Sequence, residues 1–192
     1  MQLIGLTGRA GCGKDTVADF LCETHGFVQI ALADPLRDGL KAMLGLTAEQ
    51  LHRRDLKESQ VDWIGRSPRA LLQTLGTEWG RELICPDLWL RVAARRIEQI
   101  KAAPPILHVA GIVVSDIRYE NEADWLRGLG GKVWLIKRNT RHTLNGATAN
   151  HSSEQHIPTE MGEPRIYNFG TLDDLYDQVT EAIFTDPNRK DD

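Results

Sequence analysis

The stretch that most constrains this chain is residues 2–19, QLIGLTGRAGCGKDTVAD. It opens with a short apolar run typical of a buried parallel strand, and it ends in a segment that favours a helix. Between them, GRAGCGK at residues 8–14 has the spacing Gly-x4-Gly-Lys. Glycines accept positive φ, so the backbone N–H groups of such a loop can turn inward, toward the positive end of the following helix dipole. The stretch therefore predicts a phosphate-binding loop, with Lys14 contacting the outer phosphates of a nucleoside triphosphate.

The residues after the lysine depart from the commonest form of this motif. Asp15 stands where Ser or Thr usually holds Mg²⁺, and Thr16 follows one residue later. This order resembles the Gly-Lys-x-Thr form of nucleoside monophosphate kinases, which implies that the hydroxyl binds a phosphate and that the metal is held largely through water. Asp15 could carry a water of the Mg²⁺ shell or orient the loop. Equally, it could be a favourable negative charge in the first turn of a helix.

Length and charge limit the classes to which the chain can belong. Its 192 residues suffice for one α/β domain. The net charge is −4 with both signs interspersed, so no broad basic face indicates a nucleic-acid polymer or a membrane as partner. The 3 cysteines lack metal-ligand spacing and are typical of reduced thiols in a cytosol. We expect neither a membrane span nor a signal peptide. We also expect a cytoplasmic location and a disordered tail at residues 186–192.

Residues 14–66, after the loop, contain predicted helices and a strand in alternation. A helix is predicted from Lys14 to about residue 23, ending near Gly26, and a strand at residues 27–30. Asp34 is a good N-cap for a second helix, which Gly45 ends. The apolar stripe of this second helix consists of Leu36, Leu40, Met43 and Leu44. Residues 47–66 are polar and weakly periodic, and we expect a mobile segment on the substrate side there.

A further pair of helices is predicted over residues 67–101. Ser67 and Pro68 start the first of them, and residues 85–87 start the second. The buried row of the first helix is predicted from apolar residues that recur every four positions: Leu71, Leu75, Trp79 and Leu83. Arg69 and Gln73 share another row and could hold a phosphate and the edge of a base. A solvated helix face is the commoner fate of such a pair.

The segment LHVAGIVVSDIR, residues 107–118, is the second informative one. Its apolar part predicts a buried strand, and Asp116 follows at the carboxyl end, where open α/β sheets place their ligands. A carboxylate there suits the water shell of Mg²⁺; Asp116 could also cap the helix predicted at 119–127, which carries Glu122, either in place of that role or together with it. Arg118 can supply positive charge to a transferring phosphoryl group.

The last third of the chain contains a long irregular segment. It follows a strand predicted at 132–136 and includes two basic residues, Arg138 and Arg141. A loop this long inside a compact domain is usually functional, so we expect a lid over about residues 138–163 that closes over the triphosphate. The histidines of this segment do not complete a metal ligand set. A strand at 165–169 and a helix capped by Thr171 complete the chain.

This alternation predicts an α/β fold, a three-layer domain in which a parallel sheet has helices on both faces. One domain is expected over residues 1–185. The ligand is expected along the carboxyl edge of the sheet.

Several segments together resemble the phage-type deoxynucleoside monophosphate kinases, which have a P-loop NTPase-like fold. The resemblance covers nearly the whole chain, and its most distinctive parts are RALLQTLGTEWGR and SDIRYENEAD. It is supported by LTGRAGCGKDTVADF, ALADPLRDGL, HSSEQ and NFGTLDDLYDQV, in the same order. It implies transfer of the γ-phosphate of ATP to a deoxynucleoside monophosphate, with Mg²⁺ and no covalent enzyme intermediate. A homodimer and, for a phage protein, the host cytoplasm are further implications.

The resemblance also implies roles for individual residues. ATP-phosphate ligands would be Gly11, Gly13, Lys14, Asp15 and Thr16. The substrate side would include Asp34, Arg69, Gln73, Asp116, Arg118, Glu122 and Arg141. Catalytic charge would come from Lys14, Arg118 and Arg138, with Arg138 also on ATP. Asn168 and Thr171 would lie near the adenine, although Phe169 stands where a small polar residue is expected.

Two other functions are open at this point. A dephospho-coenzyme A kinase, or another small-molecule kinase, also opens with a segment such as GLTG. A nucleotide-binding module that switches a partner would bind a triphosphate without transferring phosphate to a monophosphate. Such a module usually carries Ser or Thr directly after the lysine, so Asp15 counts against it.

Overall fold

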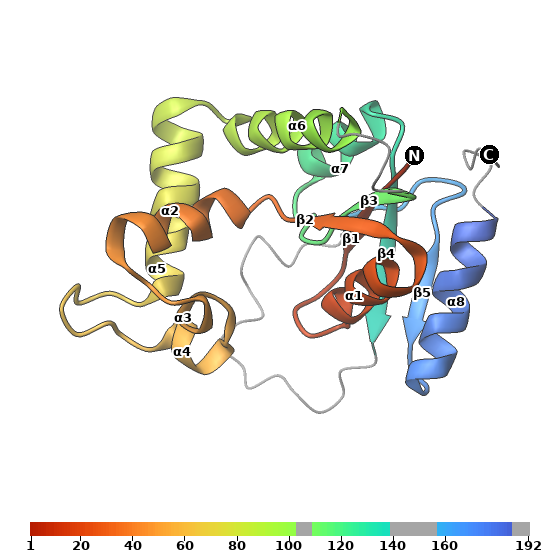
Figure 1. Cartoon of the computed structure of the whole chain (residues 1–192), viewed down its shortest axis with the longest axis horizontal. Helices are drawn as coiled ribbons and strands as arrows, with labels where there is room; N and C mark the ends of the chain where they lie inside the picture. The colour runs from red at the N-terminus through yellow and green to blue at the C-terminus, as the bar shows by residue number, and fades with distance from the viewer. Residues whose placement is uncertain (103–108, 139–156, 186–192) are drawn as a thin grey trace. The chain divides into compact units, whose positions relative to one another are not determined.

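The computed structural model of this chain describes residues 1–102, 109–138 and 157–185. Contacts divide the chain into two compact units, one formed by Met1–Ala31 with Lys101–Asp192 and the other by Leu32–Ile100. We call them the sheet unit and the helical unit; Figure 1 labels most elements of each. The expectation of one domain over residues 1–185 stays a prediction. Residues 139–156 of the predicted lid and the predicted tail lie outside the described residues.

The sheet unit is built on five parallel strands in the order β2-β3-β1-β4-β5. The strands are β1 (Gln2–Thr7), β2 (Phe27–Ile30), β3 (Gly111–Val114), β4 (Lys132–Arg138) and β5 (Arg165–Asn168). Each of the predicted strands is present, and β4 continues two residues beyond the predicted end at 136. Arg138, expected in the lid, is therefore the last residue of a strand. Because all strands run parallel, their carboxyl ends meet at one edge.

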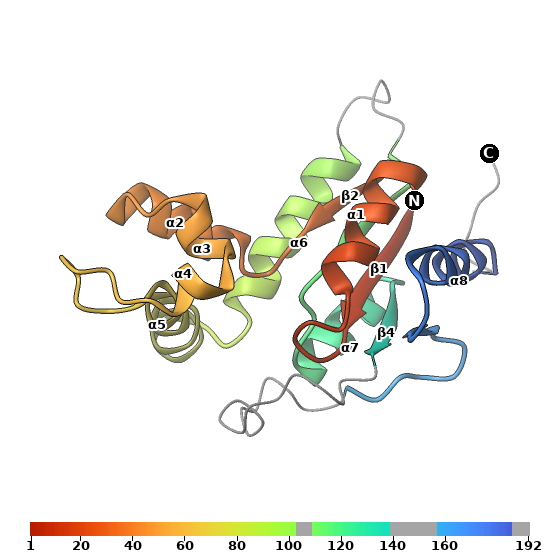
Figure 2. The ribbon, with the colours of Figure 1, turned by 90° about the horizontal axis from the view of Figure 1, so that it is seen from below.

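Helices cover both faces of this sheet. α1 (Lys14–His25) lies alongside β1 (Figure 2) and packs with α8 (Leu172–Phe184) on one face, where Ile4 and Leu6 join their core. α7 (Glu120–Gly128) covers the other face. A Cβ built on Gly5 would lie 2.6 Å from Leu126 Cδ2, so this glycine lets α7 approach the strand closely. The predicted α/β fold is confirmed.

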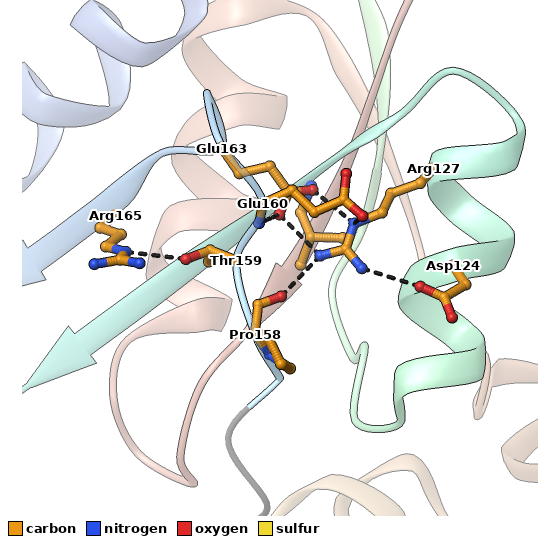
Figure 3. A network of polar contacts seen from close by, with 8 residues as sticks. Asp124, Arg127, Pro158, Thr159, Glu160, Glu163 and Arg165 are labelled. Carbon is orange, nitrogen blue, oxygen red and sulfur yellow. Dashed lines mark hydrogen bonds and ion pairs between the residues drawn. The ribbon is translucent and has the colours of Figure 1, made fainter.

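A half-buried ion pair fixes the chain that enters β5 (Figure 3). Glu163 Oε1 accepts hydrogen bonds from Arg127 Nε at 3.0 Å and from Val133 N at 2.9 Å. Glu163 Oε2 accepts from Arg127 Nη2 at 2.9 Å and from Glu160 N at 2.7 Å. Burial alone would raise the pKa of Glu163, but these hydrogen bonds lower it more, so its pKa lies below the usual value. The carboxylate thus joins α7, β4 and the start of β5.

The helical unit contains six helices in chain order. They are α2 (Asp34–Leu44), α3 (Ala48–His52), α4 (Arg54–Glu58), α5 (Pro68–Gln73), the π-helix η1 (Thr74–Ile84) and α6 (Leu88–Lys101), the last reaching the boundary with the sheet unit. The core consists of Leu36, Leu40, Leu46, Leu51, Leu72 and Trp89. The segment 47–66, expected to be mobile, includes the short helices α3 and α4.

The prediction of a buried row over residues 67–84 is wrong for its last two members, Trp79 and Leu83. Trp79 and Leu83 are 45% and 76% exposed. The buried positions are instead Pro68, Leu72, Gly76 and Gly80. The indole of Trp89 explains the difference, because its Nε1 donates to the carbonyl oxygen of Gly76 at 2.7 Å. A Cβ built on Gly80 would lie 2.5 Å from the same ring, so the glycine face is the one that can accept it.

Smaller corrections concern helix ends and stripes. Ser67 and Thr171 cap their helices as predicted, and Gly26 and Gly45 end α1 and α2. The N-cap of α2 is Ala33, and Asp34 lies one position inside the helix. Met43, predicted in the apolar stripe, is 63% exposed because it lies at the edge of that stripe.

Among the described residues, no helix is long and apolar enough to cross a membrane.

Candidate active site

The loop between β1 and α1 has the backbone geometry that anion binding requires. Gly8, Gly11 and Gly13 have φ of 142°, 74° and 107°, a region that favours glycine. A Cβ built on Gly8 would lie 2.3 Å from the carbonyl oxygen of Ile136, so the loop also packs tightly on β4. Gly13 is the N-cap of α1 and no described side chain caps it. The first N–H groups of α1 are therefore available to an anion.

Lys14 lies over this loop. Its Nζ donates hydrogen bonds to the carbonyl oxygens of Gly8 at 2.7 Å and Arg9 at 3.1 Å. Nζ also lies 3.9 Å from the Sγ of Cys12, which is buried. Burial raises the pKa of the Cys12 thiol despite the nearby ammonium group, so the thiol is neutral near pH 7. The loop therefore presents one ammonium group and a set of backbone amides.

Asp15 and Thr16 occupy the first turn of α1, at its second and third positions. Asp15 is exposed and Thr16 is half-buried. Both side chains thus start from the end of α1 whose N–H groups face the loop.

Asn168, predicted near the adenine, contacts the phosphate loop directly. Its Nδ2 donates a hydrogen bond to the carbonyl oxygen of Cys12 at 3.0 Å. In the sheet, Asn168 pairs with Arg138 across β4 and β5. Sequence reasoning missed this contact because it joins residues 156 positions apart.

Asp116 lies at the carboxyl edge of the sheet, as predicted. The neighbouring N–H of Ser115 donates to the carbonyl oxygen of Ile30, and that of Ile117 donates to Leu6. The segment around Asp116 thus spans the carboxyl ends of β2 and β1, and β1 leads directly into the phosphate loop. Asp116 is half-buried there.

Glu122, expected on the substrate side, caps the helix that follows Asp116. Its side chain is buried, and its Oε2 accepts from the backbone N–H of Arg118 at 2.7 Å and of Tyr119 at 3.2 Å. The N-cap of α7 is Tyr119, so the alternative in which Asp116 caps this helix is wrong. Glutamate at the third helical position is the signal that could have identified this cap.

The two predicted catalytic arginines and the residues predicted near the adenine belong to the sheet unit. Arg118 and Arg138 are exposed and form no ion pair with another described residue. The Thr171 hydroxyl oxygen accepts from Asp174 N at 3.2 Å, and the hydroxyl donates to Asp174 Oδ2 at 2.8 Å, so Thr171 is engaged as a helix cap. Phe169 is 60% exposed. Arg141 lies outside the described residues.

The other predicted substrate residues belong to the helical unit. Asp34 accepts a hydrogen bond from Arg37 Nη1 at 2.7 Å. Arg69 forms an exposed ion pair with Glu58, and Gln73 is exposed on the same helix. The Asp34–Arg37 pair was missed, although its spacing of three residues on a helix is a recognisable signal.

The described side chains offer few candidate metal ligands in one place. Residues 1–102, 109–138 and 157–185 contain no group of three or more His, Cys, Asp or Glu that could hold a metal ion. Mg²⁺ usually keeps several waters and uses one or two carboxylates together with substrate phosphates. Asp15 lies at the start of α1, and Asp116 lies two residues after β3; each offers one carboxylate of the kind that such a water-held ion would use.

A family model and two relatives name the same family. The family model described as deoxynucleotide monophosphate kinase matches residues 64–179. A putative deoxynucleotide monophosphate kinase of Acanthamoeba polyphaga mimivirus is 32% identical, covering 95% of this chain and 96% of that protein. A deoxynucleoside-5'-monophosphate kinase of Escherichia phage T5 is 27% identical, covering 86% of this chain and 89% of that protein. The crystal structure of TT1252 from Thermus thermophilus covers 95% of this chain and 96% of its own, with 19% identity and a TM-score of 0.47.

Proposed function

This chain belongs to the deoxynucleotide monophosphate kinase family, so it is a kinase of nucleoside monophosphates, and we propose that it transfers the γ-phosphate of ATP to a deoxynucleoside monophosphate. The products are the deoxynucleoside diphosphate and ADP. The single observation that carries the choice of a triphosphate donor is the glycine loop, whose amides and Lys14 converge at the start of α1.

Binding of the donor begins at this loop. The first-turn N–H groups of α1, with Gly11 and Gly13 in the preceding turn, receive the phosphates, and Thr16 adds a hydroxyl. Lys14 exchanges its contacts with the Gly8 and Arg9 carbonyl oxygens for contacts with the outer phosphates. Asn168 and Thr171 are proposed on the ATP side.

Charge in the transition state is stabilised by three cations. Phosphoryl transfer is mostly positioning and electrostatic stabilisation, so groups already aimed at the reacting oxygens contribute most. Lys14, Arg118 and Arg138 are proposed in this role, and the exposure of the two arginines without an ion-pair partner among the described residues supports it. Glu122 acts through Arg118 by holding its backbone N–H.

Mg²⁺, when bound, neutralises the charge of the β- and γ-phosphate oxygens. Asp116 and Asp15 would hold its water shell. Asp15 also keeps a negative charge near the start of α1, which is favourable with the helix dipole.

Candidate acceptor residues are proposed on each unit by itself. Arg69 and Gln73, four residues apart on α5, offer a guanidinium group for a phosphate and an amide for a base edge. Asp34 is a further candidate on the helical unit, and Asp116 and the lid residue Arg141 are candidates outside it. The acceptor phosphate is already an anion, so it attacks in line without a strong general base. A homodimer and a host-cytoplasm location stay predictions.

A coupled assay of ADP release tests this function. The purified chain with ATP and Mg²⁺ is offered the four deoxynucleoside monophosphates, their ribose counterparts and dephospho-coenzyme A in turn. We expect ADP release with at least one deoxynucleoside monophosphate and none above background with dephospho-coenzyme A. Release with dephospho-coenzyme A alone would contradict the proposal, and no release with any acceptor would favour the switch module.

A further inference from the structure

Asn168, at the end of β5, holds the phosphate loop from the side. Its amide donates a hydrogen bond to the Cys12 carbonyl oxygen at 3.0 Å and also lies against Gly13, the residue after Cys12. A Cβ built on Gly13 would lie 2.5 Å from Asn168 Nδ2, and the φ of Gly13 is 107°. The side chain therefore occupies space that only a glycine at position 13 leaves open.

The carbonyl that Asn168 holds belongs to the same peptide group as the Gly13 N–H. This peptide is trans, as are all those in the described residues, so its C=O and N–H point in opposite directions. Drawing the Cys12 carbonyl toward β5 aims the Gly13 N–H away from β5. Within the described part of the chain this N–H has no protein acceptor. It is therefore one of the amides that the loop can offer to an anion.

The position of Asn168 is itself fixed by its neighbours. Its strand pairs with β4, where Arg138 lies opposite Asn168. On the other side, Gln178 of α8 accepts from Tyr167 N at 2.9 Å and donates to Tyr167 O at 3.0 Å. The amide that reaches the loop thus starts from a strand that is held from both sides.

We infer that Asn168 is a positioning residue, which orients the Cys12–Gly13 peptide so that the Gly13 N–H binds a phosphate of the triphosphate. This inference rests on the proposed function and replaces the adenine contact implied by the resemblance. The two roles differ in what they require of the ligand. A loop-positioning residue acts on any polyphosphate, whereas an adenine contact acts only on a ligand that carries the base.

Calorimetric titrations with magnesium ATP and with magnesium tripolyphosphate separate these roles. For Asn168→Ala we expect both dissociation constants to rise by a similar factor, about tenfold, the ratio that one lost hydrogen bond of about 1.4 kcal/mol produces. Asn168→Asp, which keeps the shape but cannot donate and adds a negative charge, should weaken both ligands further. If the alanine variant does not fold, Asn168→Leu, which has a similar volume but neither a donor nor a charge, provides the same test. Weaker binding of ATP with unchanged binding of tripolyphosphate would overturn the inference.

Gln178→Ala is the matched control for a merely structural effect. It removes two hydrogen bonds that hold β5 and touches no loop residue. We expect a lower melting temperature with both dissociation constants unchanged. If Gln178→Ala weakens the ligands as much as Asn168→Ala does, loosening of the strand explains the effect and the inference fails. Wild-type protein that binds neither ligand would overturn the proposed function too, whereas wild-type affinity in Asn168→Ala overturns only the inference.

Discussion

At the scale of single residues, the ammonium group of Lys14 is held over the phosphate loop by the carbonyl oxygens of Gly8 and Arg9. We expect Lys14→Ala to lower kcat by at least about 10²-fold, the usual loss when one preorganised donor to a developing charge is removed. Lys14→Met fills nearly the same space without charge and should lose as much. The measurement is steady-state turnover, with circular dichroism to show that each variant is folded. Near-wild-type turnover in either variant would rule out the proposed role.

Substitution of Glu122 tests whether its side chain maintains the position of Arg118. Glu122→Ala leaves the backbone N–H groups of Arg118 and Tyr119 without their acceptor, and we expect a loss of about 1–3 kcal/mol in the free energy of unfolding. Because the turn that carries Arg118 loosens, kcat should fall as well. Urea unfolding and turnover are the two measurements.

Asn121→Ala is the control for Glu122, since Asn121 is exposed on the same turn of α7. It should change stability by no more than about 0.5 kcal/mol. If both variants unfold at the same urea concentration, the buried carboxylate does not hold this turn.

At the scale of elements, the Glu163 carboxylate links α7, β4 and the entry to β5. Its pKa is lower in the folded chain than in the unfolded chain, so the stabilisation is present above the unfolded pKa and is lost as pH falls through the folded pKa. Glu163→Gln should therefore be less stable than wild type at pH 7, by about 1.5–3 kcal/mol, the usual contribution of hydrogen bonds to a charged group. The difference should shrink at pH below about 4. Urea unfolding of both proteins across this pH range measures it.

The Arg53–Asp55 pair provides the control for that experiment, because both side chains are more than half exposed. Asp55→Asn should give no measurable difference in the pH dependence of stability. A wild-type advantage over Glu163→Gln that stays constant down to pH 2 would contradict the proposed contribution of the carboxylate.

Element boundaries could be predicted where the signal lies in neighbouring residues. The ends of α1 and α2 at Gly26 and Gly45, both left-handed, are local features of this kind. The buried face of η1 could not be predicted in this way, because it depends on the indole of Trp89, which lies on a different helix. The same holds for the site, where the loop follows from its spacing but the Asn168 contact joins distant segments.

At the scale of the whole molecule, the proposed donor and acceptor residues belong to different units. The phosphate loop lies on the sheet unit, whereas Arg69 lies on the helical unit. Arg69→Ala should raise the KM for the monophosphate by about tenfold or more, since a hydrogen bond to a charged group contributes about 1.5–3 kcal/mol. The KM for ATP should change much less. Initial rates with each substrate varied in turn provide both constants.

Arg53→Ala is the control within the same unit, because Arg53 is exposed and, among the described residues, its ion pair is a local one with Asp55. It should leave both KM values unchanged. An equal rise in the two constants for Arg69→Ala would contradict its placement on the acceptor side.

Transfer of a radiolabelled γ-phosphate from ATP is the most direct test of the central claim, which is direct donation from the bound triphosphate to a deoxynucleoside monophosphate. The wild-type chain is incubated with labelled ATP, Mg²⁺ and each monophosphate, and the products are separated. We predict label in the deoxynucleoside diphosphate, in amounts equal to the ADP formed. Label that stays in ATP, or that appears only as inorganic phosphate, would contradict the claim.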